Sequence, residues 1–566
     1  MMISKVKVKH FKQFEDQEFI LSDHIVLAGP NNSGKTSLLQ AIVAWRLALT
    51  KWLMERGAGS KAKKRPGAPI TRKDFTALPL RDMKLLWTNT AVSQKKDEGQ
   101  PGYPRVIEIA IEGKEGAERW ELAFEFRYQS SEQIYVKPSE KYIDNIPTPI
   151  QDFTIVHVPP FSGIGAEETR YDRPYQDLLI GQGKAGDILR NLLLEVYQQE
   201  DKSYWNELCQ QIEEIFGYRL SPPEYEGRPY ILCEYLKGVP RGKGKNGFPQ
   251  LDIASAGSGF HQVLLLLAFF YARPATVFLL DEPDAHLHVI LQKQIYDMLR
   301  SKARQRSCQL IIATHSEVLI DATSPEMILS FYQKPHILIC EDERDQVRES
   351  LKRLTAADIL RAELSPGILY VEGETDFNLL KAWANVLNHD LKDWFNSNPF
   401  WHDNKGCDPK EAKGHFFALR GVKPAMKGYL LLDGDNRRIS DHDMGCVNLE
   451  IGRWTRYEAE SYLLNPQVLI RFIESKGIPL LSSIAEDYLK EELPPIILRE
   501  PLKDHDYFIS TPVSKTILPQ FFKKAEISIS KADYYQIAEE MRPDEIVPEV
   551  KEKLDAIQEA FQYRKK

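Results

Sequence analysis

Eight residues near the N-terminus have the spacing of a loop that binds the phosphates of a nucleotide. Residues 29–36 read Gly-Pro-Asn-Asn-Ser-Gly-Lys-Thr and fit the pattern G-x-x-x-x-G-K-[ST]. An apolar run at 25–28 enters the loop as a predicted buried strand, and residues 37–43 leave it as a predicted helix. Backbone N–H groups at the start of that helix would meet the phosphates, with Lys35 on the β and γ phosphates and the Thr36 hydroxyl on Mg²⁺. The residues predicted to bind ATP here are Asn31, Asn32, Ser33, Gly34, Lys35 and Thr36.

Two later apolar stretches each end in carboxylates. Residues 368–371 are followed by Glu372, and residues 429–432 are followed by Asp433-Gly434-Asp435. Because adjacent parallel strands open on one crevice at their carboxyl ends, we expect Glu372 and Asp433 to lie close together. Asp435 is two residues from Asp433 and is expected to point the same way. Such hard oxygen ligands would bind Mg²⁺ or Mn²⁺, ions that support in-line phosphoryl transfer.

Each of these acids also has a simpler interpretation. Asp376, four residues after Glu372, is a further candidate ligand, but it lies where a helix cap would lie. The Asp433 and Asp435 pair is also compatible with a solvated turn. Both alternatives remain open at the level of the sequence.

Two further motifs belong with the phosphate-binding loop. The apolar run 277–280 ends in Asp281 and Glu282, which is the pattern of a Walker B strand. Asp281 is predicted to hold Mg²⁺ through water, and Glu282 to polarise the attacking water. A second apolar strand, 310–314, ends in His315, which is predicted to sense the γ-phosphate unless it is an ordinary core histidine.

Composition sets the general class of protein. The chain has 566 residues, 43% apolar and 27% charged, which indicates a globular protein of two to four domains. No apolar window reaches the about 18 residues of a membrane span, and residues 1–6 lack a signal-peptide core. The cysteines are scattered without a C-x-x-C pair, which favours a cytoplasmic location. The net charge of −7 means that nucleic acid would bind through a local basic patch or through metal.

The motifs resemble those of one ATPase group. Residues 11–14, Phe-Lys-Gln-Phe, followed by 29–32 resemble the opening of the structural-maintenance, RecF and Rad50 branch of ABC-type ATPases. Residues 256–262 resemble the ABC signature loop, in which Ser258 and Gly259 would contact the γ-phosphate of ATP held by a second subunit. This resemblance implies a homodimer or a larger homo-oligomer. The loop has one residue more than usual before its glutamine, which puts rapid ATP turnover in doubt.

The resemblance also gives a division into domains. The fold class is α/β, with a P-loop ATPase head interrupted by a helical insertion of about two helices that either packs on the sheet or pairs two subunits. Two strands within residues 2–28 are predicted to start the nucleotide-binding sheet, and 104–127 to form a hairpin. The predicted segments are 1–165 and 218–337 for the head, 166–217 for the insertion, 338–365 for a connector, 366–475 for a second α/β domain and 476–566 for a helical C-terminal part.

The second domain resembles a family of metal-dependent enzymes. V-E-G-x-x-D at 371–376 followed by L-D-G-D at 432–435 resembles the Toprim domain, a Rossmann-like parallel sheet. A Toprim domain behind an ABC-type head resembles the OLD (overcoming lysogenization defect) nucleases. This implies a DNA endonuclease that binds and hydrolyses ATP, requires Mg²⁺ or Mn²⁺ and acts in anti-phage defence. Whether ATP activates or inhibits cleavage, and whether partner proteins of a defence system take part, stays open at this level. The alternative is a repair ATPase of the RecF or Rad50 type whose Toprim domain binds nucleic acid without cutting it.

Later residues of the family pattern are matched less firmly. Glu460 matches a later acidic motif and is a candidate ligand for a second metal, the alternative being an acid on a helix surface. A late lysine is implied near the scissile phosphate. Lys515, after the strand-like stretch 507–509, is the first candidate, with Lys523 and Lys531 as rivals. The basic run at 56–73 is predicted to be a solvated loop or a phosphate contact.

Overall fold

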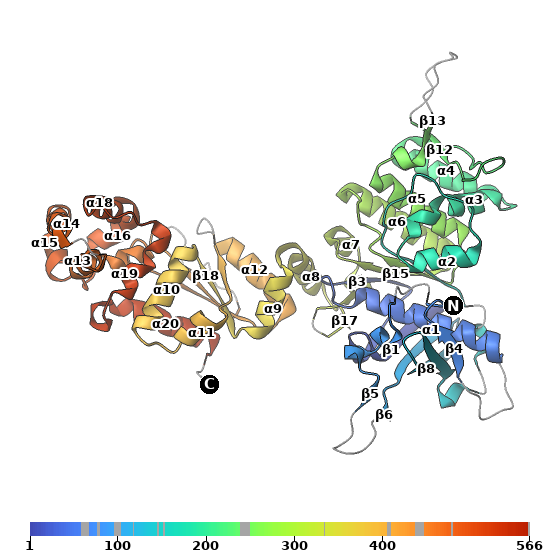
Figure 1. Cartoon of the computed structure of the whole chain (residues 1–566), viewed down its shortest axis with the longest axis horizontal. Helices are drawn as coiled ribbons and strands as arrows, with labels where there is room; N and C mark the ends of the chain where they lie inside the picture. The colour runs from blue at the N-terminus through green and yellow to red at the C-terminus, as the bar shows by residue number, and fades with distance from the viewer. Residues whose placement is uncertain are drawn as a thin grey trace, which may run out of the picture. The chain divides into compact units, whose positions relative to one another are not determined.

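The computed structural model describes residues 1–57, 67–75, 80–94, 103–116, 118–143, 146–150, 153–237, 250–332, 334–404, 409–435, 447–476 and 479–563. The chain forms two compact units, 1–351 and 352–566 (Figure 1). The division falls inside the predicted connector, whose residues form α8 (Glu341–Arg353) and α9 (Ala356–Leu364). None of the described helices is both long and apolar enough to cross a bilayer.

A six-stranded sheet with the order β10-β14-β15-β3-β16-β17 forms the centre of the first unit. Its strands are parallel except for the last, β17, which is antiparallel to β16. The strands are β3 (His24–Ala28), β10 (Ile155–Val158), β14 (Val277–Asp281), β15 (Gln309–Thr314), β16 (Ile328–Ser330) and β17 (His336–Ile337). Strands β3, β14 and β15 are buried at every position, as expected for parallel strands covered on both faces.

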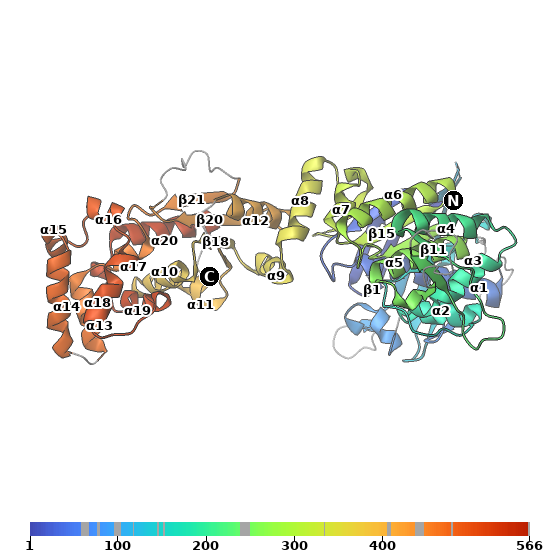
Figure 2. The same ribbon diagram turned by 90° about the horizontal axis from the view of Figure 1, so that it is seen from above.

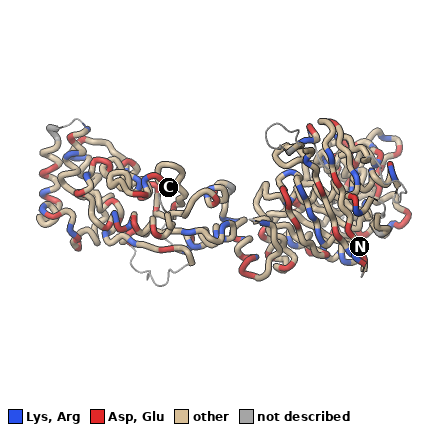
Figure 3. The backbone as a smooth tube through the Cα atoms, turned by 90° about the horizontal axis from the view of Figure 1, so that it is seen from below, with Lys and Arg blue, Asp and Glu red and all other residues tan. Residues whose placement is uncertain are grey.

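A second, antiparallel sheet of six strands has the order β2-β1-β7-β8-β9-β4. Its strands are β1 (Met2–Phe11), β2 (Phe14–Ile20), β4 (Ala68–Thr71), β7 (Ile107–Glu115), β8 (Glu118–Tyr128) and β9 (Gln133–Pro138). The predicted hairpin at 104–127 is confirmed as β7 and β8. The placement of the first two strands in the nucleotide-binding sheet is wrong, because β1 alternates buried Val6 and Val8 with Lys5 and Lys7, which pair with Glu18. That alternation suits a sheet with one face in water. Basic and acidic residues are interspersed along the whole chain, as Figure 3 shows.

The helix after the phosphate-binding loop, α1 (Lys35–Arg56), lies between the two large sheets. It contacts β1, β4, β7, β8 and β9 of the antiparallel sheet, and β10, β14 and β15 of the parallel sheet. Trp45 and Trp52 are buried on it, and the Trp45 indole donates a hydrogen bond to the Leu122 carbonyl at 2.8 Å. A helix buried on both sides holds the loop at its N-terminus rigidly.

Helices cover the other face of the parallel sheet. They are α5 (Ser258–Ala272), α6 (Val289–Gln305) and α7 (Glu317–Asp321). The predicted insertion at 166–217 contains three helices, not two, namely α2 (Arg173–Gly181), α3 (Leu189–Gln198) and α4 (Ser203–Phe216). Both α3 and α4 pack on α5, so the insertion extends the apolar core of this face. Two small sheets complete the unit, β5 (Ser93–Gln94) with β6 (Tyr103–Pro104), and β11 (Tyr218–Leu220), β12 (Glu234–Lys237) and β13 (Gln250–Asp252).

The second unit is built on a four-stranded parallel sheet with the order β19-β18-β20-β21. The strands are β18 (Gly367–Val371), β19 (Trp401–Asp403), β20 (Lys427–Leu432) and β21 (Leu449–Arg453). Leu369 and Val371 join the core formed with α10 (Glu374–Val386) and α20 (Pro548–Phe561). Ile368 and Tyr370, which point to the other face, join a core with α12 (Pro409–Val422). The expected α/β arrangement of this region is therefore present.

The C-terminal region of the second unit is helical, as predicted. Figure 2 shows α13 (Pro466–Ser475), α14 (Pro479–Glu492) and α18 (Leu518–Lys524) side by side, in agreement with the contacts of α14 with α13 and α18. Residues 507–509, expected to be strand-like, belong instead to the short helix α16 (Asp506–Ser510), because the His505 side chain accepts a hydrogen bond from the Tyr507 N–H and caps a turn. The remaining helices are α11 (Lys392–Ser397), α15 (Pro495–Arg499), α17 (Val513–Thr516) and α19 (Tyr535–Glu539).

Candidate functional site

The phosphate-binding loop joins β3 to α1 at the carboxyl end of the parallel sheet. Asn32 and Gly34 have positive φ angles of 63° and 110°, which curl the backbone so that its N–H groups can face an anion. The φ of 110° favours glycine at position 34, and a Cβ atom there would also lie 2.9 Å from the Phe14 ring. A cavity of about 620 Å³ opens over the loop and is lined by Asn31, Asn32, Ser33, Gly34, Lys35, Thr36, Glu282 and His315.

Lys35 and Thr36 are held in place by hydrogen bonds. The Lys35 ammonium donates to the carbonyl oxygens of Gly29 at 2.6 Å and Pro30 at 2.8 Å. The Thr36 hydroxyl donates to Asp281 Oδ1 at 3.1 Å. Burial raises the pKa of Asp281 to about 6, the Thr36 hydrogen bond opposes the rise and the Glu282 charge adds to it. A hydroxyl beside a carboxylate over the phosphate loop fits the donor set of an ATP-bound Mg²⁺.

Glu282 and His315 face each other across the cavity. His315 Nδ1 lies 3.4 Å from Glu282 Oε1, and this contact lowers the pKa of the carboxyl group and raises that of the imidazole. Glu282 has a φ of 51°, an uncommon conformation for a residue with a side chain. Since 46% of the His315 side chain is exposed, the alternative of a core histidine is wrong.

The signature residues lie away from this cavity. Ser258 and Gly259 begin α5 and are not among the residues that line the pocket over the loop. Gly259 packs against the backbone of the loop after β14, where its Cβ position is 3.3 Å from the His286 carbonyl oxygen. Within one copy of the described chain, these two residues therefore do not contact the candidate ATP pocket.

Two supporting residues of this pocket escaped the sequence analysis. Gln13, from the turn between β1 and β2, lines the cavity. Asp284 is buried and accepts a hydrogen bond from the Thr314 hydroxyl at 2.6 Å, which ties the loop after β14 to the end of β15. Gln13 lies within the Phe-Lys-Gln-Phe stretch at 11–14, and Asp284 closely follows the Walker B acids. Their closeness in sequence to these motifs is the one feature that could have marked them as residues of the ATP pocket.

The second candidate site lies at the carboxyl end of the other parallel sheet. Glu372 follows β18 and Asp433 follows β20, and the Asp433 N–H donates to Glu372 Oε1 at 3.2 Å. Asp433 Oδ1 accepts a hydrogen bond from the Ala459 N–H at 3.2 Å. Asp376 accepts one from the Gly373 N–H at 3.0 Å, so it is the third residue of α10 in a capping box, while Gly373 is the N-cap residue. The structure thus brings Glu372 and Asp433 together as expected.

Two glutamates from the segment after β21 complete the group. Glu460, in the 3₁₀ turn Ala459–Leu463, has no exposed surface, so the alternative of a helix-surface acid is wrong. Its Oε1 lies 2.7 Å from Lys531 Nζ, and neither of its oxygens accepts a well-aligned hydrogen bond from the described residues. Glu458 is also buried and accepts hydrogen bonds from the Ser514 N–H and from the Ser514 hydroxyl at 2.9 Å. Glu372, Asp376, Asp433, Glu458 and Glu460 are called the acidic cluster below.

The members of the acidic cluster repel one another. Burial, followed by the charges of Glu460 and Glu372, raises the pKa of Asp376 to about 7. The pKa of Asp433 is raised well above its usual value by burial and then by the charges of Asp376, Glu372, Glu460 and Glu458. Lys531 has a raised pKa because the carboxylates of Glu460 and Glu458 outweigh the effect of burial. Excess negative charge in a partly enclosed site favours the binding of cations.

The remaining predicted residues lie at the edge of this site. Asp435 and Lys515 are exposed, and no described hydrogen bond or ion pair joins either side chain to the acidic cluster. Lys531, the rival to Lys515, is the lysine that contacts Glu460. Glu458 was overlooked, although it stands only two residues before Glu460. Of the basic run at 56–73, residues 58–66 lie outside the described residues, and Arg72 pairs with Glu132.

The acidic cluster meets one test for a metal site and does not meet another. Its donors are all carboxylate oxygens, which suit Mg²⁺ or Mn²⁺, and the buried Glu460 oxygens lack well-aligned hydrogen-bond donors. However, no three His, Cys, Asp or Glu side chains of the described chain are arranged closely enough to hold an ion as they stand. The chemistry of the donors fits a divalent ion, but the side chains as placed in the structure are not spaced to hold one.

Two family descriptions match the sequence of the first unit. Residues 149–321 match "AAA domain, putative AbiEii toxin, Type IV TA system", and residues 1–45 match "AAA ATPase domain". The two matches contain, respectively, the Walker B strand and the phosphate-binding loop. A search among curated proteins found no match.

Solved structures similar to the chain include head domains of SMC proteins. The SMC head domain from Thermotoga maritima has a TM-score of 0.31 and 16% identity, over 58% of this chain and 94% of that one. An Smc head bound to the C-terminal winged-helix domain of ScpA has a TM-score of 0.34 and 17% identity, over 58% and 94%. A third, an Smc head with an extended coiled coil bound to the C-terminal domain of ScpA, derived from Pyrococcus furiosus, has a TM-score of 0.32 and 16% identity, over 58% and 92%. With TM-scores this low, these likenesses do not bear on the function of the chain.

The sequence matches and the pocket geometry agree on the first unit. One cavity is lined by the phosphate-binding loop and by the Glu282–His315 pair, and Asp281 is hydrogen-bonded to Thr36 of that loop. All of these residues lie within the regions that match ATPase families. The first unit is an ATPase domain of the AAA/ABC type.

Proposed function

We propose that the protein is an ATP-regulated, metal-dependent nuclease of the OLD type, in which the second unit is a Toprim domain that hydrolyses phosphodiester bonds in DNA. The observation that carries this proposal is the acidic cluster at the carboxyl end of a parallel sheet. Glu372 and Asp433 come from adjacent strands of that sheet, and Glu460 is buried beside them. A purely structural role would not require so many carboxylates in one place, because each adds repulsion that the fold must overcome.

The residues of the cluster have distinct roles in this proposal. Glu372, Asp376, Asp433 and Glu460 would hold Mg²⁺ or Mn²⁺, with the exposed Asp435 as a further ligand. When bound, the metal would supply Lewis-acid polarisation of the phosphodiester and neutralise its charge. Lys531 holds Glu460 through its ammonium group and places one positive charge at the edge of the site, where a DNA phosphate would approach. Lys531 therefore takes the role first considered for Lys515.

The ATPase domain would control cutting in this arrangement. Because Ser258 and Gly259 lie away from the pocket of their own chain, we infer that they contact ATP held by a second copy, so that ATP supports a homodimer. The proposed setting, an effector of anti-phage defence with partner proteins, rests on the family resemblance alone.

Nuclease activity of the full-length protein is the direct test of the proposal. Supercoiled plasmid is expected to be nicked in the presence of Mg²⁺ or Mn²⁺ and to stay intact with EDTA. A parallel RNA substrate tests the preference for DNA. Binding of DNA without cleavage at any concentration of either metal would instead favour the repair-type ATPase.

A change in the ATP pocket tests the proposed control. In Lys35→Ala, the effect of ATP on the rate of plasmid nicking is expected to disappear, while nicking without ATP continues at the wild-type rate. The reason is that Lys35 supplies the ammonium group of the phosphate loop and is not one of the residues proposed to hold the nuclease metal. An ATP response in Lys35→Ala equal to that of the wild type would refute the control.

The role of Lys531 has its own test. Lys531→Met is expected to lower the free energy of unfolding of the metal-free protein by about 1–3 kcal/mol, because the buried Glu460 carboxylate loses its counter-charge. The effect is kept below that of a fully buried ion pair because the Lys531 side chain is half exposed and partly screened by water. Chemical denaturation with EDTA measures this change. Lys524→Met, on the exposed side of α18, is the control for loss of a lysine charge. Equal stabilities of the two variants would contradict the assigned contact.

A further inference from the structure

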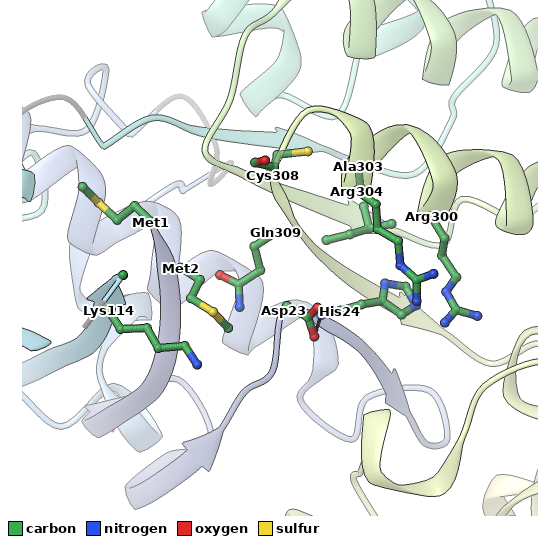
Figure 4. A pocket seen from close by; sticks show the side chains of 13 residues that line it. Met1, Met2, Asp23, His24, Lys114, Arg300, Ala303, Arg304, Cys308 and Gln309 are labelled. Carbon is green, nitrogen blue, oxygen red and sulfur yellow. Dashed lines mark hydrogen bonds between the residues drawn. The ribbon is translucent and has the colours of Figure 1, made fainter. Parts of the chain in front are cut away.

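A cavity on the ATPase domain lies at the end of the parallel sheet opposite to the phosphate-binding loop. His24 is the first residue of β3 and Gln309 is the first of β15, and both line this cavity of about 310 Å³ (Figure 4). The strands that begin here end at the phosphate-binding loop and at His315. The cavity is therefore separate from the ATP pocket but connected to it by two short, buried strands.

Three basic side chains line the cavity without acidic partners. Arg300 and Arg304 are four residues apart on α6 and so lie on one face of the helix, and Lys114 comes from the end of β7. No carboxylate of the described chain lies within salt-bridge distance, 4.0 Å, of any of the three. Asp23 is the acid among the lining residues, and it accepts a hydrogen bond from the His24 N–H at 3.0 Å. The balance of charge in the cavity is positive, which suits an anion.

The hydrogen bonds around His24 fix which of its nitrogens carries the proton. The Thr323 hydroxyl donates to the Leu319 carbonyl at 2.6 Å, so it can only accept from the Tyr296 hydroxyl. Tyr296 must then accept from His24 Nε2, which lies 2.7 Å away. Burial and the two arginines lower the pKa of His24 to about 3, so the ring is neutral. Its Nδ1 is therefore an unprotonated acceptor.

That acceptor has no partner in the described chain. His24 is only 6% exposed, and its Nδ1 is buried without a hydrogen bond. By contrast, the Gln309 amide is fully used, accepting from the Ile3 N–H and donating to the carbonyls of Ile3 and Ser22. A buried acceptor without a partner costs free energy, and a ligand that brings an N–H or O–H group would recover it.

We propose that this cavity binds a nucleoside monophosphate. The phosphate would lie against Arg300, Arg304 and Lys114, and an amino or hydroxyl hydrogen of the nucleoside would donate to His24 Nδ1. The volume of the cavity is near the lower end of the about 300–1,000 Å³ range of small-molecule sites, which suits a single nucleotide. The arginines give the planar, multiple hydrogen-bond donors that phosphate oxygens accept best.

Calorimetric titration of the full-length protein with adenosine monophosphate tests the proposal. AMP is expected to bind to the wild type and to Lys35→Ala with equal affinity, because AMP lacks the β and γ phosphates that the other pocket recognises. Arg300→Gln/Arg304→Gln is expected to weaken AMP binding roughly tenfold or more, the effect of losing hydrogen bonds to a charged group. Lys293→Gln, an exposed charge on the same helix outside the cavity, is the matched control and is expected to keep the wild-type affinity.

Two further titrations separate the anion from the nucleoside. Inorganic phosphate is expected to bind more weakly than AMP, and His24→Phe is expected to reduce AMP affinity to that of phosphate. Lys114→Gln tests the opposite wall of the cavity if the double variant does not fold. The proposal is overturned if AMP does not bind, if Lys35→Ala abolishes its binding, or if phosphate and AMP bind equally well.

Discussion

Replacing Glu282 with glutamine is expected to reduce the rate of ATP hydrolysis by about 10²–10⁴-fold while ATP still binds. Glu282 lines the pocket over the phosphate-binding loop, and its contact with His315 lowers the pKa of its carboxyl group. It is therefore ionised at neutral pH and available to take a proton from the attacking water. Glutamine keeps the shape of the side chain but cannot accept that proton.

The measurement has two parts, steady-state phosphate release and equilibrium binding of a fluorescent ATP analogue. Glu326→Gln removes an exposed carboxylate from the same domain and is expected to leave both quantities unchanged. Hydrolysis at the wild-type rate in Glu282→Gln would show that another group activates the water. Loss of both ATP binding and hydrolysis would show that Glu282 is needed to shape the pocket. The backbone of Glu282, with its φ of 51°, is in an uncommon conformation on which the shape of the pocket could depend.

The local motifs were predictable from the sequence because their chemistry depends on residues close together in the chain. The phosphate-binding loop, the Walker B acids and His315 each follow an apolar strand, so a strand order is enough to bring them to one edge. The meeting of Glu372 and Asp433 follows from the same rule applied to β18 and β20. In each case a short pattern fixes both the residue type and its place at a strand end.

Contacts between distant segments were not predictable in this way. The alternation in β1 shows which face is buried, but it does not show that β7 is its partner, so β1 and β2 were assigned to the wrong sheet. Lys531 reaches Glu460 from a 3₁₀ turn 71 positions later in the chain, and no spacing rule connects those residues. The extra helix of the insertion arises because α2 ends at Gly181, two residues before Gly183 with its φ of 74°, and α3 begins only at Leu189. A glycine within a sequence pattern does not by itself show where one helix ends and another begins.

Substitution of Asp433 in the acidic cluster is expected to change both the stability of the protein and its nuclease activity. Asp433→Asn is expected to abolish plasmid nicking and at the same time to raise the free energy of unfolding of the metal-free protein by about 1–3 kcal/mol. Asparagine keeps the shape of Asp433 and can still accept the hydrogen bond from the Ala459 N–H. The substitution also removes a carboxylate whose negative charge is repelled by those of Asp376, Glu372 and Glu460.

The pH dependence of stability should follow from the same charges. The pKa of Asp376 rises from 3.8 to about 7 on folding, and that of Asp433 also rises. Between about pH 4 and pH 7 the unfolded chain releases protons that the folded protein retains, so the contribution of these two groups to the stability of the metal-free protein is greatest at the acid end of this range. This contribution should fall as the pH rises from about 4 to about 7. In Asp433→Asn the free energy of unfolding should change less with pH, because one of the two titrating groups is gone. For the wild type with Mg²⁺ it should rise with pH instead, because the ion binds the deprotonated carboxylates.

Denaturation curves at several pH values, with EDTA or with Mg²⁺, measure these effects. Asp435→Asn is the matched comparison, because it makes the same substitution two residues away on an exposed side chain and should change stability little. If Asp433→Asn destabilises the metal-free protein as a core mutation would, the cluster is a structural network held by its hydrogen bonds. If the acidic cluster is a metal site, Asp433→Asn should be more stable than the wild type and should no longer cut DNA. The reason is that carboxylates placed close together to bind a metal destabilise the metal-free protein.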